Sequence, residues 1–335
     1  MEAQSIPLAV QDATQIGAAR RAAVTAAQRL GISEVDAGKV ALVVTELATN
    51  LVRHAGGGEL LVRPLTEAGE AGLEIMALDR GPGIPNPEQA LRDGFSTAGT
   101  KGAGLGAVRR LAHRCEVFSP PGDGTAVLVR LLFSAPPRPS RAAVAGVCVA
   151  KPGETACGDA WCWAEHPDGW TVMVADGLGH GADASVAAAE AVRVFLQHRG
   201  EPPADVMAAA HAAMRHTRGA AIGIARVDLA RRELGFTGVG NIGGTLLAGG
   251  AARSLVSLPG IVGHESRKIQ EFVYPWPEKA VVVLYSDGLQ TRWTLDRYPA
   301  LPARDPALLA AMLYRDFTRG RDDVTVVAGR EETAA

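Results

Sequence analysis

The chain has 335 residues, with 34 basic and 36 acidic side chains and a formal net charge of -2. At roughly 150 residues per domain this length predicts two domains, and the balanced charge argues against a nucleic-acid-binding protein, which carries a basic excess. Apolar residues make up 47% of the chain, and the longest apolar runs have only the length of a strand. We therefore expect no membrane span and, since the N-terminus shows no secretory signal pattern, a cytoplasmic protein.

The four cysteines are Cys115, Cys148, Cys157 and Cys162. They form no CxxC pair, and no histidine stands beside them at zinc-ligand spacing. Because a disulfide framework is unusual in a cytosolic chain of this size, we expect buried or incidental thiols.

A proline-rich stretch, FSAPPRPSRAA at 133–143, divides the chain. Its three prolines within four positions continue neither a helix nor a central strand. We therefore predict a linker over residues 134–140, between an N-terminal domain at 1–133 and a C-terminal domain at 141–332.

The N-terminal segment alternates strand and helix patterns. An apolar strand at 6–10 is followed by helices at about 12–30 and 34–55, the second with a predicted N-cap at Ser33. The apolar residues of this second helix recur at helical spacing and are Val40, Val43, Val44, Leu47 and Leu51. Further strands are expected at 59–63, 72–79, 115–119 and 125–133, with helices near 87–92 and 105–114. Helices beside a largely antiparallel sheet predict an α/β sandwich.

The C-terminal segment is richer in strands. The strands expected there are 143–150, 159–165, 170–176, 219–229, 233–240, 245–249, 279–287 and 323–329. Helices are expected at about 181–198, 203–217 and 306–318. Strand meanders with helices set apart predict two packed sheets flanked by helices, an α-β-β-α sandwich, so the whole chain falls in the α/β (α+β) class.

Three elements of the N-terminal segment indicate a nucleotide site. Glu46 and Asn50 lie four residues apart and so share one face of their helix, which taken alone is most simply a solvated face. Two glycine loops change this interpretation: DRGPGI (79–84) follows a strand, and GTKGAGLGAVRRL (99–111) leads into a helix. Glycines at such places let backbone N–H groups approach a phosphate, and the helix N-terminus adds positive potential.

With these motifs, residues 1–133 resemble the GHKL ATPase/kinase superfamily, which has the Bergerat fold. Within it they most resemble the RsbT-type serine/threonine switch kinases. The resemblance rests on TELATNLVRHAG (45–56), DRGPGIP (79–85) and DGFSTAGTKGAGLGAV (93–108). It implies ATP and Mg²⁺ as the cofactors of this domain.

The resemblance also implies roles for individual residues. Asn50 would coordinate Mg²⁺ bridging the ATP phosphates, Glu46 would act as general base on the substrate hydroxyl, and Asp79 would receive the adenine amino group. The glycines implied in the adenine pocket are Gly81 and Gly83, and those implied in the lid over the phosphates are Gly102, Gly104 and Gly106. Lys101 in the lid either adds charge near the phosphates or is simply solvated. This set suits phosphoryl transfer, which needs positioning and charge neutralisation more than covalent help.

Four aspartates of the C-terminal segment, Asp159, Asp176, Asp287 and Asp322, stand where predicted strands begin or end. A single Asp-Gly after a strand is often only a turn. Clustered carboxylates, however, repel one another and would take up protons unless a cation neutralises them. Because oxygen-only ligands favour Mg²⁺ or Mn²⁺, these residues predict a site for two such ions, which could activate water for attack on a phosphoryl group.

Residues 141–330 resemble the metal-dependent phosphatases of the 2C type, closest to the SpoIIE-like branch and within it to RsbX-type phosphatases. The stretches that carry this resemblance are ETACGDAW (154–161), VADGLGHG (174–181), RGAAIGIARVD (218–228), GVGNIGG (238–244), YSDGL (285–289) and RDDVTVV (321–327). The metal ligands that it implies are the side chains of Asp159, Asp176, Asp287 and Asp322 and the carbonyl of Gly177.

Three further residues of this segment lie outside the implied ligand set. Asp323 occupies the position after the last implied ligand, where many relatives have Asn, and is not counted as a ligand. His180 beside the site either belongs to a helix start or acts as a general acid. No phosphate-docking residue can be placed, because Arg141 is a poor candidate for the arginine that larger relatives carry early in the domain.

Together the two resemblances imply a bifunctional protein switch. The N-terminal domain would phosphorylate a Ser or Thr of a partner, and the C-terminal domain would remove phosphate from the same or a related partner. The implied partner is a STAS-domain protein of the stressosome or anti-sigma-factor-antagonist type, and a downstream switch protein is a further implied partner. We expect binding to neither nucleic acid nor membranes. Two alternatives stay open: an N-terminal domain that binds ATP and holds a partner without phosphoryl transfer, as an anti-sigma factor does, and a phosphatase regulated by ATP occupancy of the neighbouring domain.

Overall fold

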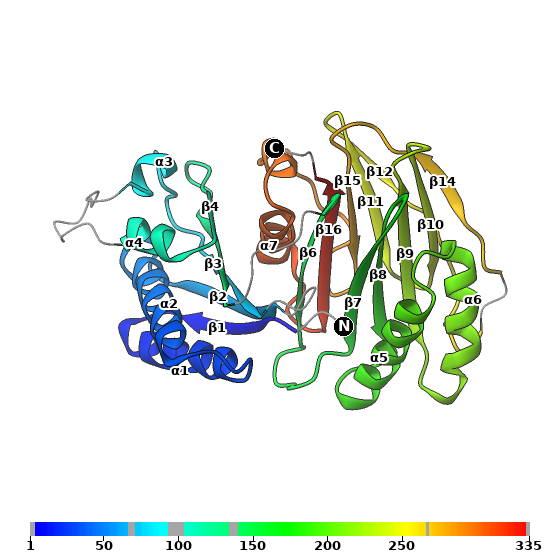
Figure 1. Ribbon diagram of the computed structural model, residues 1–335, viewed down its shortest axis with the longest axis horizontal. Helices are drawn as coiled ribbons and strands as arrows, with labels where there is room; N and C mark the ends of the chain where they lie inside the picture. Colours follow the sequence, from blue (N-terminus) through cyan, green and yellow to red (C-terminus); the bar gives the residue numbers. More distant parts are fainter. Residues whose placement is uncertain (1–3, 66–70, 93–103, 134–139, 266–267, 333–335) are drawn as a thin grey trace. The chain divides into compact units, whose positions relative to one another are not determined.

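Figure 1 shows a computed structural model of the chain, which describes residues 4–65, 71–92, 104–133, 140–265 and 268–332. The chain divides into two compact units, Ser5–Arg138 and Pro139–Ala335 with Met1–Gln4. Of the predicted linker only Ser140 is described, and its hydroxyl donates to the Ala142 carbonyl at 2.9 Å. No helix among the described residues is long and apolar enough to cross a membrane.

The unit Ser5–Arg138 is built on a five-stranded antiparallel sheet with the strand order β1-β2-β3-β5-β4. These strands are β1 (Ile6–Val10), β2 (Gly58–Leu65), β3 (Gly72–Leu78), β4 (Arg114–Phe118) and β5 (Ala126–Leu132). The helices are α1 (Ala13–Gln28), α2 (Glu34–Ala55), the short α3 (Pro87–Ala90) and α4 (Gly104–Leu111). Side chains of α1, α2 and α4 share one core with the sheet. The predicted α/β sandwich is confirmed.

Helix α2 forms and ends as its sequence predicts. The Ser33 hydroxyl accepts the Asp36 N–H at 3.1 Å and caps the first turn. The predicted apolar stripe of α2 is buried over its whole length. Gly56 ends the helix at a φ of 72°, a left-handed conformation that glycine adopts without a steric penalty. Glu46 and Asn50 lie off the buried stripe and are only half-buried.

The predicted helix at 105–114 is too long at its C-terminal end. Helix α4 ends at Leu111, and the His113 N–H donates to the Arg130 carbonyl at 2.9 Å. Arg114 is already the first residue of β4 and pairs with Arg130 in the β4–β5 ladder. Sheet pairing therefore captures residues that a local helical pattern would have continued.

The unit that contains Pro139–Ala335 holds two sheets. The first has the order β13-β10-β9-β8-β7, with β14 also paired to β10, and the second has the order β12-β11-β15-β16-β6. The strands of the first sheet are β7 (Asp159–His166), β8 (Gly169–Gly177), β9 (Ala220–Asp228), β10 (Glu233–Val239), β13 (Ser257–Leu258) and β14 (Phe272–Pro275). Those of the second are β6 (Ala142–Val149), β11 (Gly243–Ala248), β12 (Ala251–Ser254), β15 (Val281–Tyr285) and β16 (Val324–Glu331).

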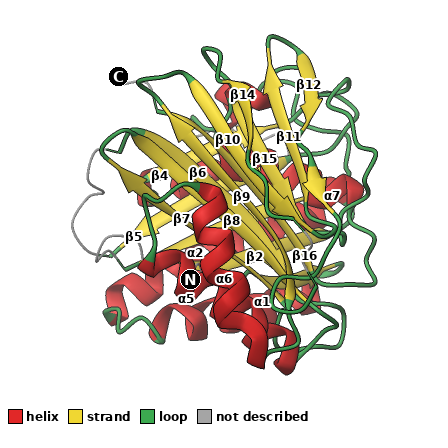
Figure 2. Ribbon diagram, turned by 90° about the vertical axis from the view of Figure 1, so that its right-hand side faces the viewer, coloured by secondary structure: helices red, strands yellow, loops and turns green. Residues whose placement is uncertain are grey.

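Helices cover the outer faces of these two sheets (Figure 1 and Figure 2). Helices α5 (Ala182–Gln197) and α6 (Pro203–Ala213) pack on the first sheet, and α7 (Pro306–Phe317) packs on β6 and β16 of the second. Two short 3-10 helices, η2 (Met214–His216) and η3 (Leu301–Ala303), complete the regular elements described. The predicted α-β-β-α sandwich is confirmed.

Large aromatic side chains fill the space between the two sheets. Trp161 and Trp170 are fully buried there beside Trp276, whose ring meets that of Trp170 edge to face at 5.9 Å. A separate core lies between the first sheet and α5 and α6. The four cysteines are free thiols, as predicted, and all but Cys115 are buried.

Candidate functional site

The N-terminal candidate site is centred on α2. Glu46 and Asn50 stand one turn apart on this helix, and a Cβ added to Gly104 would lie 3.7 Å from Glu46 Oε2. The start of α4, which contains Gly104 and Gly106, therefore lies beside the predicted general base. Lys101 and Gly102 lie outside the described residues.

The predicted adenine-binding turn packs tightly against the C-terminal end of α2. Asp79 directly follows β3, and its Oδ1 accepts the N–H groups of Gly81 at 2.8 Å and Thr125 at 3.1 Å. A Cβ on Gly81 would lie 2.7 Å from the Ala55 Cβ, so only glycine fits there. Gly83 has a φ of 79°, which also favours glycine. The main-chain N–H groups of Gly81 and Thr125 therefore hold the Asp79 carboxylate in place.

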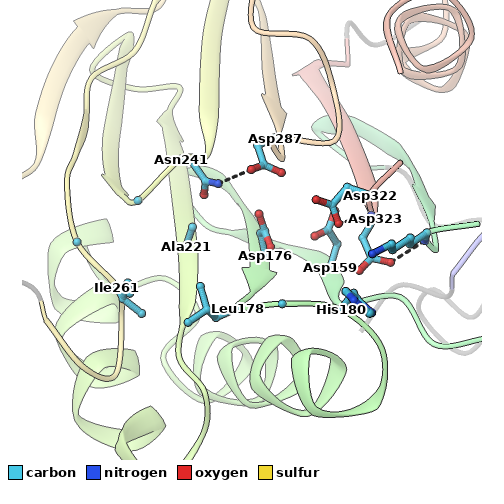
Figure 3. A pocket seen from close by; sticks show the side chains of 14 residues that line it. Asp159, Asp176, Leu178, His180, Ala221, Asn241, Ile261, Asp287, Asp322 and Asp323 are labelled. Atoms are coloured by element: carbon cyan, nitrogen blue, oxygen red, sulfur yellow. Dashed lines mark hydrogen bonds between the residues drawn. The ribbon is translucent and has the colours of Figure 1, made fainter. Parts of the chain in front are cut away.

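The second candidate site is a pocket of about 390 Å³ in the C-terminal unit (Figure 3). All four aspartates predicted to bind metal line it. Asp159 begins β7 and pairs with Asp176 of β8 in the first sheet. Asp287 follows β15 and Asp322 precedes β16, both strands of the second sheet. The pocket therefore gathers carboxylates from both layers of the sandwich.

Gly177 completes the predicted ligand set and is held by its neighbours. It is the last residue of β8, is buried, and its N–H donates to the Gly158 carbonyl at 3.0 Å. A Cβ at this position would overlap the carbonyl oxygen of Ala184 in the first turn of α5. The close approach of two backbones therefore requires glycine after Asp176.

Two of the pocket carboxylates are costly to ionise. Burial raises the pKa of Asp159 to about 7, although a hydrogen bond from Ser286 acts in the opposite direction. Burial, followed by the charges of Asp159 and Asp287, raises the pKa of Asp176 to about 9. Asp159 Oδ1 is buried and has no hydrogen-bond partner in the described part of the chain. A bound cation would relieve both the repulsion and the lost hydration.

The donor set fits Mg²⁺ or Mn²⁺ that keeps part of its water shell. Within the described ranges, no three His, Cys, Asp or Glu side chains form a group that could hold an ion by themselves. Mg²⁺, however, usually takes only one or two carboxylates and retains several waters. Carboxylates spread around a pocket, with a main-chain carbonyl nearby, suit such ions, and the all-oxygen set excludes a preference for zinc.

Two polar residues that sequence analysis missed hold these carboxylates in place. The Ser286 hydroxyl donates to Asp159 Oδ2 at 2.6 Å and accepts the Thr325 N–H at 2.9 Å. Asn241 Nδ2 donates to Asp287 Oδ2 at 2.7 Å. Both residues lie in motifs already singled out, YSDGL and GVGNIGG. The available signal was a polar side chain at a strand end, directly before Asp287 for Ser286 and directly after Gly240 for Asn241.

Asp323 and His180 also line the pocket. Asp323 Oδ1 accepts the Lys151 N–H at 2.8 Å, so at least one of its oxygens supports the loop after β6. His180 is exposed and lies two residues before α5, and its Nδ1 is 2.8 Å from Glu154 Oε1. The structure thus gives His180 a carboxylate partner at the edge of the pocket.

Comparison with known proteins identifies the N-terminal unit. Residues 9–131 match the family model of the histidine kinase-like ATPase domain. The serine/threonine-protein kinase RsbT of Bacillus subtilis (strain 168) is 39% identical over 112 residues, which is 33% of this chain and 84% of RsbT. The chain belongs to the histidine kinase-like ATPase family. The predicted resemblance to RsbT-type kinases is confirmed.

The histidine kinase-like ATPase domain is followed by a SpoIIE-type phosphatase domain with homology to RsbX, as predicted. Residues 166–330 match the model of stage II sporulation protein E. The phosphoserine phosphatase RsbX of B. subtilis (strain 168) is 26% identical over 142 residues, 42% of this chain and 70% of RsbX.

Two solved structures share this C-terminal fold. One chain, from a study of the bacterial stressosome as a modular system that controls secondary messenger signalling, is 27% identical with a TM-score of 0.53 and covers 57% of this chain and 100% of its own. A crystal structure of RsbX in complex with magnesium is 20% identical with a TM-score of 0.51, over 58% of this chain and 98% of its own.

Proposed function

We propose that the chain is a bifunctional protein switch that both phosphorylates and dephosphorylates Ser or Thr residues of a partner protein. The observation that supports this most is the pocket in which Asp159, Asp176, Asp287 and Asp322 meet, in a chain whose kinase-type domain retains Glu46 and Asn50. Both reactions transfer a phosphoryl group, in opposite directions. Since one reaction consumes ATP, we place the switch in the cytoplasm.

In the kinase reaction, ATP is the phosphoryl donor. Asp79 orients the adenine through its amino group, in the pocket shaped by Gly81 and Gly83. The residues that would lie over the phosphates are Gly102, Gly104, Gly106 and Lys101. Glu46 takes the proton of the substrate hydroxyl as its oxygen attacks the γ-phosphorus and ADP leaves. Asn50, one turn from Glu46, would hold the Mg²⁺ that neutralises charge on the phosphates.

In the phosphatase reaction, water attacks the phosphorus of a phosphoserine or phosphothreonine, and the products are the free hydroxyl and inorganic phosphate. The residues that would hold two Mg²⁺ or Mn²⁺ ions are Asp159, Asp176, Asp287 and Asp322, with the Gly177 carbonyl. Bound there, such ions would lower the pKa of the attacking water and stabilise charge on the phosphoryl group. Ser286 and Asn241 orient Asp159 and Asp287 through the hydrogen bonds described above.

We further propose that the substrate is a STAS-domain protein, of the anti-sigma-factor-antagonist or stressosome type, in a partner-switching pathway with a downstream switch protein. The support is the likeness of the two halves to RsbT and RsbX and to a chain solved in a stressosome study. Placing both activities on one chain keeps them at one effective concentration near a shared substrate.

The test uses the Asp176→Asn variant, which keeps the kinase residues and removes a phosphatase ligand. The variant, γ-labelled ATP and Mg²⁺ are added to soluble extract from the source organism. We expect one small labelled protein, which loses its label when wild-type protein and Mn²⁺ are added. The double variant Glu46→Gln/Asp176→Asn is the control and should produce no label. ATP binding without labelling of any protein would contradict the kinase assignment and favour an ATP-sensing binding domain.

A further inference from the structure

The wall of the phosphatase pocket between β8 and α5 continues outward onto the protein surface. Leu178 lines the pocket and is 51% exposed, so its apolar side chain is accessible from solvent beside the pocket. Its N–H donates to the Gly219 carbonyl at 3.0 Å. This bond joins the segment after Asp176 to the turn before β9, so the two segments form one rim at the pocket mouth.

Arg218 occupies a fixed place in this rim. The Gly219 N–H donates to the Thr217 hydroxyl at 3.0 Å, and a Cβ on Gly219 would lie 2.6 Å from Ile261 Cγ2. The backbone on both sides of Arg218 is therefore held in place. Its Nη1 lies 3.3 Å from the position that a Cβ of Gly179 would occupy, so the guanidinium covers a pocket-lining glycine.

The guanidinium is available for exchange with an incoming acidic group. Its Nη2 pairs with Asp183 Oδ2 in the first turn of α5, and the Arg218 and Asp183 side chains are 51% and 66% exposed. Ion pairs this exposed contribute little to stability, and a guanidinium carries five N–H donors. Val186, three residues after Asp183 on the same helix face, is a second apolar side chain that is largely exposed.

We propose that this pocket rim, Leu178, Gly179, Asp183, Val186 and Arg218, docks the polypeptide segment that carries the phosphorylated residue. Arg218 pairs with an acidic side chain next to the phosphoserine or phosphothreonine, and Leu178 and Val186 pack against an apolar neighbour. A phosphoryl group among the pocket aspartates brings its flanking residues to this rim, because Leu178 and Gly179 belong to both. The proposal rests on the phosphatase function above and adds a sequence preference to it.

The test compares three substrates that differ in the residues beside the phosphoryl group, which are the residues expected to contact the rim. The first is a phosphoserine peptide with glutamate and leucine beside the phosphoserine, and the second has lysine in place of the glutamate and keeps the leucine. The third, p-nitrophenyl phosphate, has no flanking residues. The variants are Arg218→Ala and Arg218→Glu. The matched control is Arg193→Ala, which removes an arginine that is 50% exposed and is paired with Glu190 further along α5.

We expect wild-type protein with Mn²⁺ to prefer the acidic peptide by about fivefold in kcat/KM, through KM, the range expected for one exposed ion pair. Arg218→Ala should remove the preference, Arg218→Glu should reverse it, and Arg193→Ala should keep it. Hydrolysis of p-nitrophenyl phosphate should be the same in all four proteins. A preference that survives both Arg218 substitutions would overturn the proposal, as would an equal loss on all three substrates. Failure of wild-type protein on every substrate would instead refute the phosphatase function, and the docking surface with it.

Discussion

Asp159 and Asp176 face each other directly across the β7–β8 ladder, and Asp159 is almost completely buried. Like charges at directly opposed positions of a sheet destabilise it. No cation of this chain is paired with either carboxylate in the hydrogen bonds and ion pairs of the described residues. The carboxylates of Asp159 and Asp176 therefore repel each other when both are ionised, and bound protons or cations relieve this repulsion. The repulsion has measurable consequences.

Replacing Asp176 by Asn should raise stability and abolish activity together. Asp176→Asn removes the cost of either protonating this carboxyl or holding two charges opposite each other. At about pH 8 we therefore expect the melting temperature of the metal-free protein to rise by about 2–4 °C per kcal/mol of cost removed. Phosphatase activity should fall at least about 100-fold, because a predicted metal ligand is lost. Calorimetry in EDTA and a p-nitrophenyl phosphate assay check both effects.

The control for both effects of Asp176→Asn is Asp168→Asn. Asp168 lies in the exposed turn that joins β7 and β8 at the ends opposite Asp159 and Asp176. It should change stability by less than about 0.5 kcal/mol and leave activity intact. A lower melting temperature for metal-free Asp176→Asn would show that the two carboxylates do not repel each other in the folded protein.

The metal-free protein should lose stability as the pH rises. The pKa of Asp159 is raised to about 7 and that of Asp176 to about 9, whereas free aspartates titrate near pH 4. Between these values the native state binds more protons than the unfolded chain, so the free energy of unfolding decreases with increasing pH. The stabilisation that comes from protonated Asp159 and Asp176 is complete below about pH 4. It is lost as the pH rises through their pKa values in the folded protein.

Divalent cations replace those protons, so the gain in melting temperature from Mn²⁺ should be larger at about pH 8 than at about pH 6. Thermal melts over this range, with EDTA or with Mn²⁺, provide the measurement. A metal effect independent of pH would contradict the assignment of these carboxylates to the cation site.

Glu46→Gln should separate ATP binding from phosphoryl transfer. The amide cannot accept the substrate proton, so transfer should fall by about 100-fold or more, while nucleotide affinity stays within about threefold of wild type. Labelled-ATP transfer and calorimetric titration with ATP measure the two properties. Glu34→Gln, in the exposed first turn of the same helix, is the matched control and should leave both unchanged. Transfer at the wild-type rate would remove Glu46 from the mechanism.

Gly177→Ala should damage the phosphatase pocket through backbone crowding alone. The added Cβ would overlap the Ala184 carbonyl, so the first turn of α5 must move. We expect a loss of about 1–3 kcal/mol in the unfolding free energy of this unit, with loss of activity. The same substitution at Gly38 in α2, which has open space around it, should instead stabilise its helix by up to about 1 kcal/mol. Chemical denaturation of the two variants makes the comparison.

Local patterns were sufficient for the parts of the molecule that depend on neighbours in sequence. The cap at Ser33, the buried stripe of α2 and the shared face of Glu46 and Asn50 all follow from helical periodicity. Asp176 and Asp287 were found because each follows an apolar strand. The strands β12 and β14 were missed, since β12 is exposed throughout and the four residues of β14 are too few to show an alternating pattern.

Contacts between distant segments could not be predicted. The Ser286 hydroxyl reaches Asp159 across the space between two sheets, and Arg218 reaches Gly179 from another loop. Such contacts depend on sheet order and packing, which leave no periodic trace in a single sequence. The residues that support the site were therefore missed, although the carboxylates that form it were not.

Strand β16 has a consequence for how the protein is made. It is the last strand of the described chain, but it lies between β15 and β6 in the second sheet. While the chain leaves the ribosome, at about 5–20 residues per second, β6 and β15 keep unpaired edges and Asp322 has not yet reached the pocket. The sheet that carries the kinase-type site is complete by Leu132. A nascent chain, or one cut before Val324, therefore has the complete sheet of the kinase-type domain but lacks β16 in the second sheet of the phosphatase-type domain. Under the function proposed above, such truncation would leave phosphorylation without its reversal.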